Sequence, residues 1–384
     1  MRGGSPEATS VPPAKGSPLR GRYLANNPAL RAMMTASDLL LAPLRVWRRR
    51  TPEASVPRRV LLSVGGHLGD AVIATAAIRR LADALPDAEI GVLLPRSSAV
   101  VLDGNASVVR RHYVDHWYFD RRPAGFVRKL AAYRRTRRQA IAELRAAGYD
   151  AAIDLYDYFP NSALLLWRAG IPVRIGFDAA GFSPLYSHVL RWPADERHTA
   201  ERQLLLLRTL VPTIDDRQAP IADLAVASGD VASRVDALLA GHGLSGSDFT
   251  IVHPGAGSRA KEWPLAQWRA LVEQVAATGE MVVLTGRGER EHALTRSLMD
   301  GLPGCVDLCD QLDWAELVQL VRLARRVISL DTAVAHVAGA VGTPAATLWT
   351  SPSSPTHWRP LGTRSVIVDC RQARDAASVL ELTP

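Results

Sequence analysis

The sequence predicts an α/β protein in which two Rossmann-like domains face a central cleft. Short apolar runs alternate with helical patterns from Val60 to residue 211, and the alternation restarts at Thr250 and continues to Trp349. Such alternation is typical of parallel sheets that are covered by helices on both faces. A chain of 384 residues is ample for two separate cores.

The first half begins with a strand, a turn and a helix. Val60–Val64 is a continuous apolar run, residues 65–70 form a glycine-rich turn, and Ala71–Leu85 has the small and aliphatic residues of a buried helix. Further strands are expected at 90–94, 150–155 and 174–177, helices at 164–167, 199–211 and 231–239, a loop at 181–192, and a linker at 213–219.

The second half repeats this alternation. Strands are expected at 250–252, 281–284, 306–308, 327–330 and 345–349, and helices from Pro264 and at 292–299, 314–324 and 331–340. Ligands of such sheets bind beyond the carboxyl ends of the strands. The turns at 65–70, 253–261 and 331–336 are therefore expected to line one cleft.

The excess positive charge lies at the start of the chain. Residues 1–60 hold eleven Lys or Arg and three Asp or Glu, which accounts for the whole net charge of +8. Met1–Leu19 is rich in Gly, Ser and Pro and is expected to be disordered. Residues 24–50 combine an apolar helical face with a basic cluster, which suits a helix on an anionic membrane or one packed on the protein body. The expected order is a basic leader at 1–56 and domains at 57–235 and 247–384.

Composition excludes several classes of protein. No apolar run reaches the roughly 18 residues of a membrane-spanning helix, and the first residues lack the apolar core of a secretory signal. The three cysteines, Cys305, Cys309 and Cys370, are too few for a disulfide framework and lack zinc-site spacing. We therefore expect a cytoplasmic protein.

A basic stretch with interleaved aromatic residues runs from Val108 to Asp150. It suits a solvated amphipathic helix, or contact with a phosphorylated acceptor or anionic lipid. Nucleic acid would also fit such a patch, but no recognised nucleic-acid module accompanies it, so no nucleic-acid partner is expected.

The loop after the strand at 250–252 has the features of an anion site. His253, Gly255 and Ser258 lead to Lys261, and Pro264 opens a helix. A glycine-rich turn before a helix offers free N–H groups and a favourable dipole, to which lysine adds a charge. The loop is expected to hold a diphosphate, although an ordinary turn with a solvated lysine has the same pattern. The turn at 65–70 lacks the spacing of a nicotinamide-binding fingerprint.

Three patterns together resemble one family. They are Gly69-Asp70 after a strand, His-Pro-Gly-x-x-x-x-x-Lys-x-Trp-Pro at 253–264, and Leu-Asp-Thr-x-x-x-His at 330–336. In this order they resemble the ADP-heptose:lipopolysaccharide heptosyltransferases, glycosyltransferase family 9, over roughly residues 58–365. The resemblance implies a GT-B fold whose first domain binds the acceptor and whose second binds the sugar nucleotide. It also implies inverting, metal-independent transfer of a sugar from an ADP-sugar, without a cofactor.

The resemblance also implies roles for single residues. Asp70, beside Gly69, would be the general base, although a helix-capping aspartate looks the same. Thr332 would bind phosphate, while Asp331 and His336 would orient sugar or phosphate groups, unless His336 is a satisfied interior histidine. Glu289 would hold the ribose, with Glu291 as a close competitor.

The sequence also agrees with metal independence and departs from the family in two places. It contains no Asp-x-Asp pair that would chelate a metal–diphosphate, so Lys261, Ser258 and helix amides would have to neutralise the leaving group. Ala333 stands where the family often has glycine, and Thr75-Ala76-Ala77 where it usually has proline.

The expected function is transfer of heptose from ADP-heptose to a lipopolysaccharide-core or other cell-surface glycan or glycolipid. The enzyme would work at the cytoplasmic face of the plasma membrane, with peripheral membrane contact as an open question. The alternatives are a family member that glycosylates a small molecule or a protein, and a non-catalytic sugar-nucleotide-binding protein.

Overall fold

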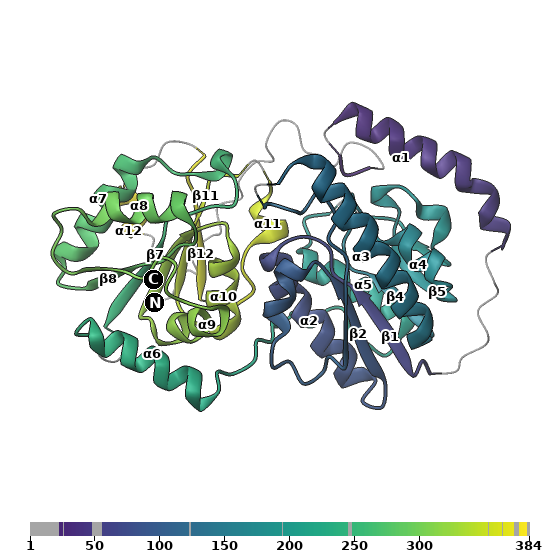
Figure 1. The fold of residues 1–384 in the computed structure, drawn as a ribbon, viewed down its shortest axis with the longest axis horizontal. Coiled ribbons are helices and arrows are strands. Elements are labelled where there is room, and N and C mark those ends of the chain that lie inside the picture. The colour runs from purple at the N-terminus through teal and green to yellow at the C-terminus, as the bar shows by residue number, and fades with distance from the viewer. Residues whose placement is uncertain are drawn as a thin grey trace, which may run out of the picture.

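The computed structural model describes residues 23–25, 27–47, 56–122, 124–193, 195–244, 248–351, 353–362, 364–371 and 376–381. The two predicted sheets are present, each with six parallel strands (Figure 1). The first has the order β3-β2-β1-β4-β5-β6 and the second the order β12-β11-β10-β7-β8-β9. The strands are β1 (Arg59–Ser63), β2 (Glu89–Leu94), β3 (Arg110–Tyr113), β4 (Ala151–Asp154), β5 (Val173–Phe177), β6 (His188–Leu190), β7 (Phe249–His253), β8 (Met281–Leu284), β9 (Cys305–Asp307), β10 (Arg326–Leu330), β11 (Ala345–Trp349) and β12 (Ser365–Asp369).

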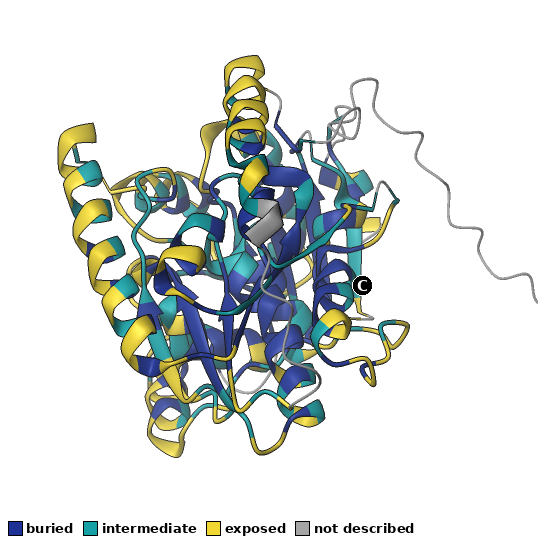
Figure 2. Cartoon of the chain, turned by 90° about the vertical axis from the view of Figure 1, so that its right-hand side faces the viewer, coloured by how far each residue is buried: buried dark blue, intermediate teal, exposed yellow. Residues whose placement is uncertain are grey.

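Helices cover both faces of the first sheet. The helices are α2 (Leu68–Ala84) and α5 (Thr199–Leu210) on one face and α3 (Phe126–Ala147) and α4 (Ala163–Ala169) on the other. Strand β1 contributes side chains to the cores on both faces of the sheet. Val60 and Leu62 belong to the core under α2 and α5, and Leu61 belongs to the core under α3 and α4. Figure 2 shows the result, with buried strands inside and exposed helix faces outside.

The second sheet is covered in the same way. The helices are α6 (Gly229–Gly241), α9 (Trp314–Leu323) and α10 (Ala333–Val341) on one face and α7 (Leu265–Ala277), α8 (Glu289–Met299) and α12 (Ala376–Glu381) on the other. A short helix, α11 (Pro355–Trp358), lies between the two lobes in Figure 1.

Two details of the sequence-based prediction need correction. Helix α6 packs on α9, and Arg234 forms an ion pair of 2.7 Å with Glu316, so the first domain ends before this helix rather than at residue 235. The predicted loop at 181–192 contains the edge strand β6. Short edge strands have weak apolar patterns, because only one side of the strand pairs with the sheet.

The helix expected within residues 24–50 is α1 (Pro28–Leu41), followed by the 3-10 turn η1 (Ala42–Trp47). Helix α1 packs on the first domain through Met34, which is fully buried, and Asp38, which accepts hydrogen bonds from the backbone N–H and hydroxyl of Ser183. Its outer face remains open, with Leu39 and Leu40 70% and 80% exposed. The disorder expected at Met1–Leu19 lies outside the described residues.

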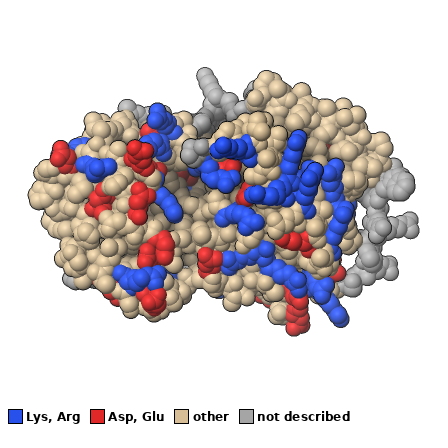
Figure 3. Space-filling model, viewed as in Figure 1, with Lys and Arg blue, Asp and Glu red and all other residues tan. Residues whose placement is uncertain are grey.

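The basic stretch from Val108 to Asp150 contains β3, a loop and α3. Arginines on the outer face of α3 are exposed: Arg128, Arg134, Arg135, Arg138 and Arg145. Figure 3 shows Lys and Arg side chains gathered over the region that α3 occupies in Figure 1. Among the described residues, no helix is both long and apolar enough to cross a membrane.

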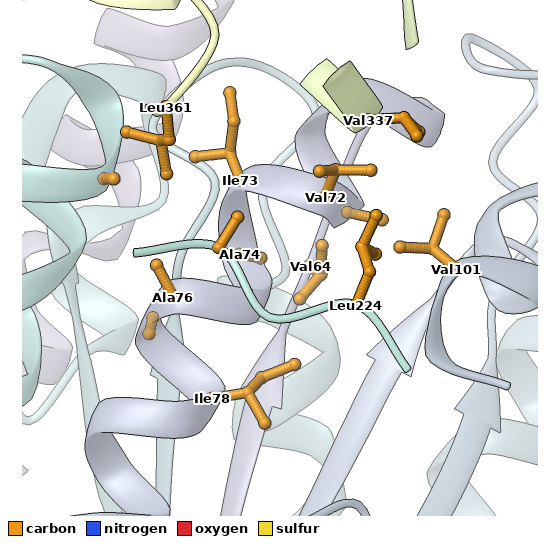
Figure 4. Packing of buried hydrophobic residues seen from close by; sticks show 14 of the residues in the cluster. Val64, Val72, Ile73, Ala74, Ala76, Ile78, Val101, Leu224, Val337 and Leu361 are labelled. Carbon is orange, nitrogen blue, oxygen red and sulfur yellow. The ribbon is translucent and has the colours of Figure 1, made fainter. Parts of the chain in front are cut away.

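The two domains meet through α2 and α10, which pack against each other. Val72 and Val337 belong to one apolar cluster at this contact (Figure 4). Both helices begin directly after the carboxyl end of a central strand, so their contact brings two predicted turns together.

Candidate active site

The first turns of α2 and α10 approach each other closely. A Cβ atom at Gly69 would lie 2.8 Å from Cδ2 of His336, which is closer than side chains normally pack. Glycine at residue 69 therefore allows the contact between the turn of the first domain and that of the second. The contact places the predicted base and the predicted phosphate-binding turn in one site.

Asp70 lies in the first turn of α2 and completes the helix start. Its Oδ2 accepts a hydrogen bond of 2.6 Å from the backbone N–H of His67. The pKa of Asp70 is raised to about 6, mainly by burial and also by the carboxylates of Asp331 and Asp157, against the hydrogen bond from His67 and the charge of Lys261, which lower it. A carboxylate of this kind is ionised at neutral pH and remains basic enough to take a proton.

The charges of Lys261 and Asp331 are close enough to Asp70 to change its pKa. Asp70 belongs to the first domain, whereas Lys261 and Asp331 belong to the second. The structure thus brings all three together across the domain contact.

Lys261 lies at the end of the 3-10 turn η5 (Arg259–Lys261) and is already paired. Its Nζ donates to Oδ2 of Asp331 at 2.7 Å, and its backbone carbonyl accepts from the hydroxyl of Thr350 at 2.6 Å. Lys261 therefore presents a fixed ion pair rather than the free cation that the sequence suggested. Ser258 caps the same turn, since its Oγ accepts from the N–H of Ala260.

Thr332 is the N-cap of α10, and its hydroxyl has no partner. Its Oγ1 is buried and makes no hydrogen bond within the described residues, although N-cap hydroxyls normally accept one from their own helix. The first N–H groups of a helix also lack partners within that helix. This turn can therefore donate several hydrogen bonds to an anion.

His336 is buried one turn further along α10. Its Nε2 lies 4.0 Å from Oδ1 of Asp331, and its Nδ1 has no partner within the described part of the chain. Burial lowers the pKa of His336, Asp331 raises it and Lys261 lowers it. The unpartnered Nδ1 does not fit a fully satisfied interior histidine.

The glycine-rich loop from His253 to Lys261, which we call the donor loop, contacts the start of α8 at its other end. Nδ1 of His253 lies 3.1 Å from the hydroxyl of Thr285, and burial lowers the pKa of His253. A Cβ atom at Gly255 would lie 2.5 Å from the carboxylate oxygens of Glu291. Glu289, in contrast, is exposed at the first position of α8. The geometry thus favours Glu291 over Glu289 beside the donor loop.

A small cavity borders Asp70 and contains residues that the sequence did not single out. About 10 Å³ is open to the centre of a water molecule, which is room for about one. Its other lining residues come from four separate segments: Val64, Gly65, Leu155, Tyr156, Thr199, Gln203 and Trp358. Tyr156 follows the carboxyl end of β4 and could have been found from that position, whereas Trp358 has no local signal.

Arg121 is another residue near the site that the sequence did not single out. It was one of eleven basic residues in the stretch before and within α3, and only the folded chain places it against Gly257 of the donor loop.

Among the described residues, no cluster of three or more His, Cys, Asp or Glu could hold a metal ion.

Comparisons with known proteins agree on one family. A family model described as glycosyltransferase family 9 (heptosyltransferase) matches residues 137–381. Lipopolysaccharide heptosyltransferase 3 of Escherichia coli is 25% identical over 300 residues, covering 76% of this chain and 83% of that protein.

Solved structures show the same fold. The chain is similar to the structure of E. coli ADP-heptose lps heptosyltransferase II, with a TM-score of 0.65, 23% identity, and coverage of 85% of this chain and 95% of that one. It is also similar to E. coli heptosyltransferase WaaC with ADP, with a TM-score of 0.67, 20% identity, and coverage of 84% and 98%.

Proposed function

Because the chain belongs to glycosyltransferase family 9 and has its GT-B fold, we propose that it transfers heptose from ADP-heptose to a hydroxyl of a lipopolysaccharide-core or other cell-surface glycan. The chain is a glycosyltransferase by family, and the proposal concerns the donor, the acceptor and the mechanism. The names of its relatives support heptose as the sugar and lipopolysaccharide as the acceptor.

One observation carries the mechanistic proposal. A half-buried carboxylate of the first domain, Asp70, lies within electrostatic reach of the Lys261–Asp331 pair of the second domain. This is the arrangement that a glycosyl transfer needs, with a base on the acceptor side and groups for an anionic leaving group on the donor side.

The reaction proceeds as a single displacement. The acceptor hydroxyl oxygen attacks the anomeric carbon of heptose while Asp70 takes its proton, and the bond from that carbon to the β-phosphate oxygen of ADP breaks. Because attack and departure occur on opposite faces, the configuration inverts. ADP leaves with the electron pair of the broken bond.

The negative charge of the departing ADP is stabilised by protein groups. The hydroxyl of Thr332, the first amides of α10 and the ammonium of Lys261 are donors at this place. Preorganised donors of this kind stabilise a developing anion without a metal ion. The sequence also lacks the Asp-x-Asp pair with which metal-dependent glycosyltransferases hold a metal–diphosphate. Metal independence is therefore part of the proposal.

The test is release of ADP from ADP-heptose by the full chain, with and without candidate acceptors. Formation of a heptosylated lipopolysaccharide-core acceptor, undiminished by a chelator, is the expected result. Transfer only to a small molecule or a protein would assign the enzyme a different acceptor. Tight ADP-heptose binding without transfer or hydrolysis would identify a non-catalytic binding protein.

We also propose that the enzyme works at the cytoplasmic face of an anionic membrane. The outer face of α1 exposes Leu39 and Leu40, and α3 presents a row of arginines. A groove of about 500 Å³ along α3 is lined by three apolar residues and three arginines, namely Val127, Leu130, Ala131, Arg134, Arg135 and Arg138. Apolar side chains beside basic ones suit the headgroup region of an anionic bilayer.

Vesicle flotation tests this contact. The full chain is expected to float with vesicles that contain an anionic phospholipid, and the double variant Leu39→Asp/Leu40→Asp is expected to remain in solution because it adds charge to the contact face. Flotation of both proteins alike, or of neither, would remove α1 from membrane binding.

A further inference from the structure

Arg121 crosses from the first domain to the donor loop of the second. It lies between β3 and α3, yet a Cβ atom at Gly257 would lie 2.6 Å from Cζ of Arg121 and would overlap its Nη1. Glycine at residue 257 therefore leaves the space that the guanidinium occupies. In addition to the contact between α2 and α10, this contact joins a residue of the first domain to the donor loop of the second.

The guanidinium of Arg121 has no partner of its own. Within the described part of the chain it makes no hydrogen bond or ion pair, whereas the neighbouring Arg122 forms two hydrogen bonds, of 2.9 and 2.7 Å, with the carboxylate of Asp120. Arginine remains protonated in proteins and presents a planar set of donors. Burial lowers the pKa of Arg121 and the charge of Asp70 raises it, so Arg121 lies near that carboxylate without a hydrogen-bonded partner. Arg122 is exposed like Arg121 but is paired with Asp120.

The charges around the donor loop indicate that Arg121 could bind an anion there. Lys261 is neutralised by Asp331 at 2.7 Å, and Asp70 adds a further carboxylate. A diphosphate carries at least two negative charges, so a cation that is not already in an ion pair would strengthen its binding at this loop. Arg121 and Lys261 act on the same place, since His67 has its pKa lowered to about 4 by burial and then by the charges of these two residues.

We propose that Arg121 binds the diphosphate of the nucleotide-sugar from the acceptor side of the cleft, opposite Lys261. The planar fork of arginine suits the bidentate geometry of phosphate oxygens. Because Arg121 and Asp70 belong to the same domain, this contact would also hold the base in position over a loaded donor site. Donor binding and alignment of the base are then coupled, and Arg121 contributes to both.

This inference rests on the proposed function, because it assumes that ADP binds at the donor loop. An anionic acceptor would be the other natural partner for a cation beside Asp70. The two partners differ in a measurable way, since a donor contact changes the affinity for ADP in the absence of any acceptor.

The experiment measures binding of ADP and adenosine to the full chain by calorimetry. Arg121→Ala is expected to weaken ADP binding about 10- to 100-fold, as for loss of a charge-assisted hydrogen-bonding pair, and to leave adenosine binding unchanged. Arg121→Lys should recover part of the loss. Arg122→Ala is the matched control, since it removes an adjacent arginine that is paired with Asp120, and it should bind ADP like the wild type.

A double-mutant cycle measures whether Arg121 and Gly257 act together on the affinity for ADP, which a purely structural role of Arg121 would not predict. Gly257→Ala places a methyl group where the guanidinium lies and should displace Arg121 from the loop. If Arg121 acts at this loop, Gly257→Ala should weaken ADP binding much less in the Arg121→Ala background than in the wild type.

The outcomes separate this inference from the proposed function. If the wild type binds no ADP, the proposed function fails and this inference fails with it. If the wild type binds ADP and Arg121→Ala binds it equally well, only the role of Arg121 is wrong. A raised KM for the acceptor with unchanged ADP affinity would likewise overturn the proposal and assign Arg121 to the acceptor.

Discussion

Helices α2 and α10 each begin directly after a central parallel strand, and they meet at the domain contact, but their first turns are completed differently. In α2 the side chain of Asp70 accepts from the backbone N–H of His67, so the protein supplies its own anion. In α10 the hydroxyl of Thr332 is buried and unpartnered within the described residues. The same element thus holds a carboxylate in one domain and leaves donors for an external anion in the other.

This difference assigns the two halves of a transfer reaction to two helix starts. The dipole of a helix favours negative charge at its first turn in both cases. We propose that this charge is the catalytic base in α2 and the diphosphate of the donor in α10.

The largest effect is expected for Asp70→Asn. The amide oxygen can still accept from the N–H of His67, so the start of α2 is retained, but the amide cannot take a proton. The turnover number should fall about 10²- to 10⁴-fold, while the dissociation constant for ADP should stay within about twofold. Equal losses of turnover and of ADP affinity would make Asp70 a structural or donor-binding residue.

A smaller effect is expected for Lys261→Ala, in the second domain. Removal of the ammonium leaves the half-buried carboxylate of Asp331 without its partner, which repels an incoming diphosphate. Affinity for ADP should fall about 10- to 100-fold, and turnover should fall with it. Unchanged ADP affinity and unchanged rate in calorimetry and kinetics would remove Lys261 from the diphosphate site.

The pH dependence should report the base. Because burial raises the pKa of Asp70 to about 6, its carboxylate becomes protonated and unable to accept a proton as the pH falls through 6. The rate of transfer should then fall about tenfold per pH unit below this value. A profile that is flat between pH 5 and 7 would contradict the assignment, since in that range the proposed base changes its protonation state.

The raised pKa of Asp70 also predicts the sign of a stability effect. The folded state binds this proton more tightly than the unfolded state, whose pKa is near 3.8. The contribution of Asp70 therefore favours folding below about pH 4 and is lost as the pH rises through about 6. Comparison of wild type and Asp70→Asn by chemical denaturation over this range isolates the contribution.

The smallest effect concerns the two glutamates of α8. Glu291→Gln should weaken ADP binding several-fold, because Glu291 lies against Gly255, whereas Glu289→Gln should have no measurable effect. These substitutions are matched, since both keep the size of the side chain and lie two residues apart. The opposite order of effects would restore the assignment of the ribose to Glu289.

The sequence predicted the central parts of the fold better than its edges. Strands β1 and β7 are apolar runs that end in glycine-rich turns, so both signals were local. The edge strand β3, with the residues Arg110-Arg-His-Tyr, has no such run, since half of it faces solvent. An amphipathic pattern also cannot indicate which sheet a helix covers, which is why the predicted first domain extended to residue 235, within α6.

The site was predictable where its residues lie in turns and unpredictable where they meet across the fold. Asp70, Lys261 and Asp331 each follow a strand. The pairing of β7 with β10 places the turns of Lys261 and Asp331 at one edge of the second sheet, and the contact of α2 with α10 brings Asp70 of the first domain to them. The pairing of Lys261 with Asp331 and the contact of Arg121 with Gly257 join residues that are far apart in the sequence, so no local pattern indicates them. The choice between Glu289 and Glu291 depended on the position at which α8 begins.

A crystal structure of the wild-type protein with ADP tests the central claim most directly. The predicted result is a diphosphate within hydrogen-bonding distance of the Thr332 hydroxyl, the first amides of α10 and the ammonium of Lys261, with Asp70 facing its open side. A diphosphate that contacts neither Thr332 nor Lys261 would contradict the assignment of the two helix starts.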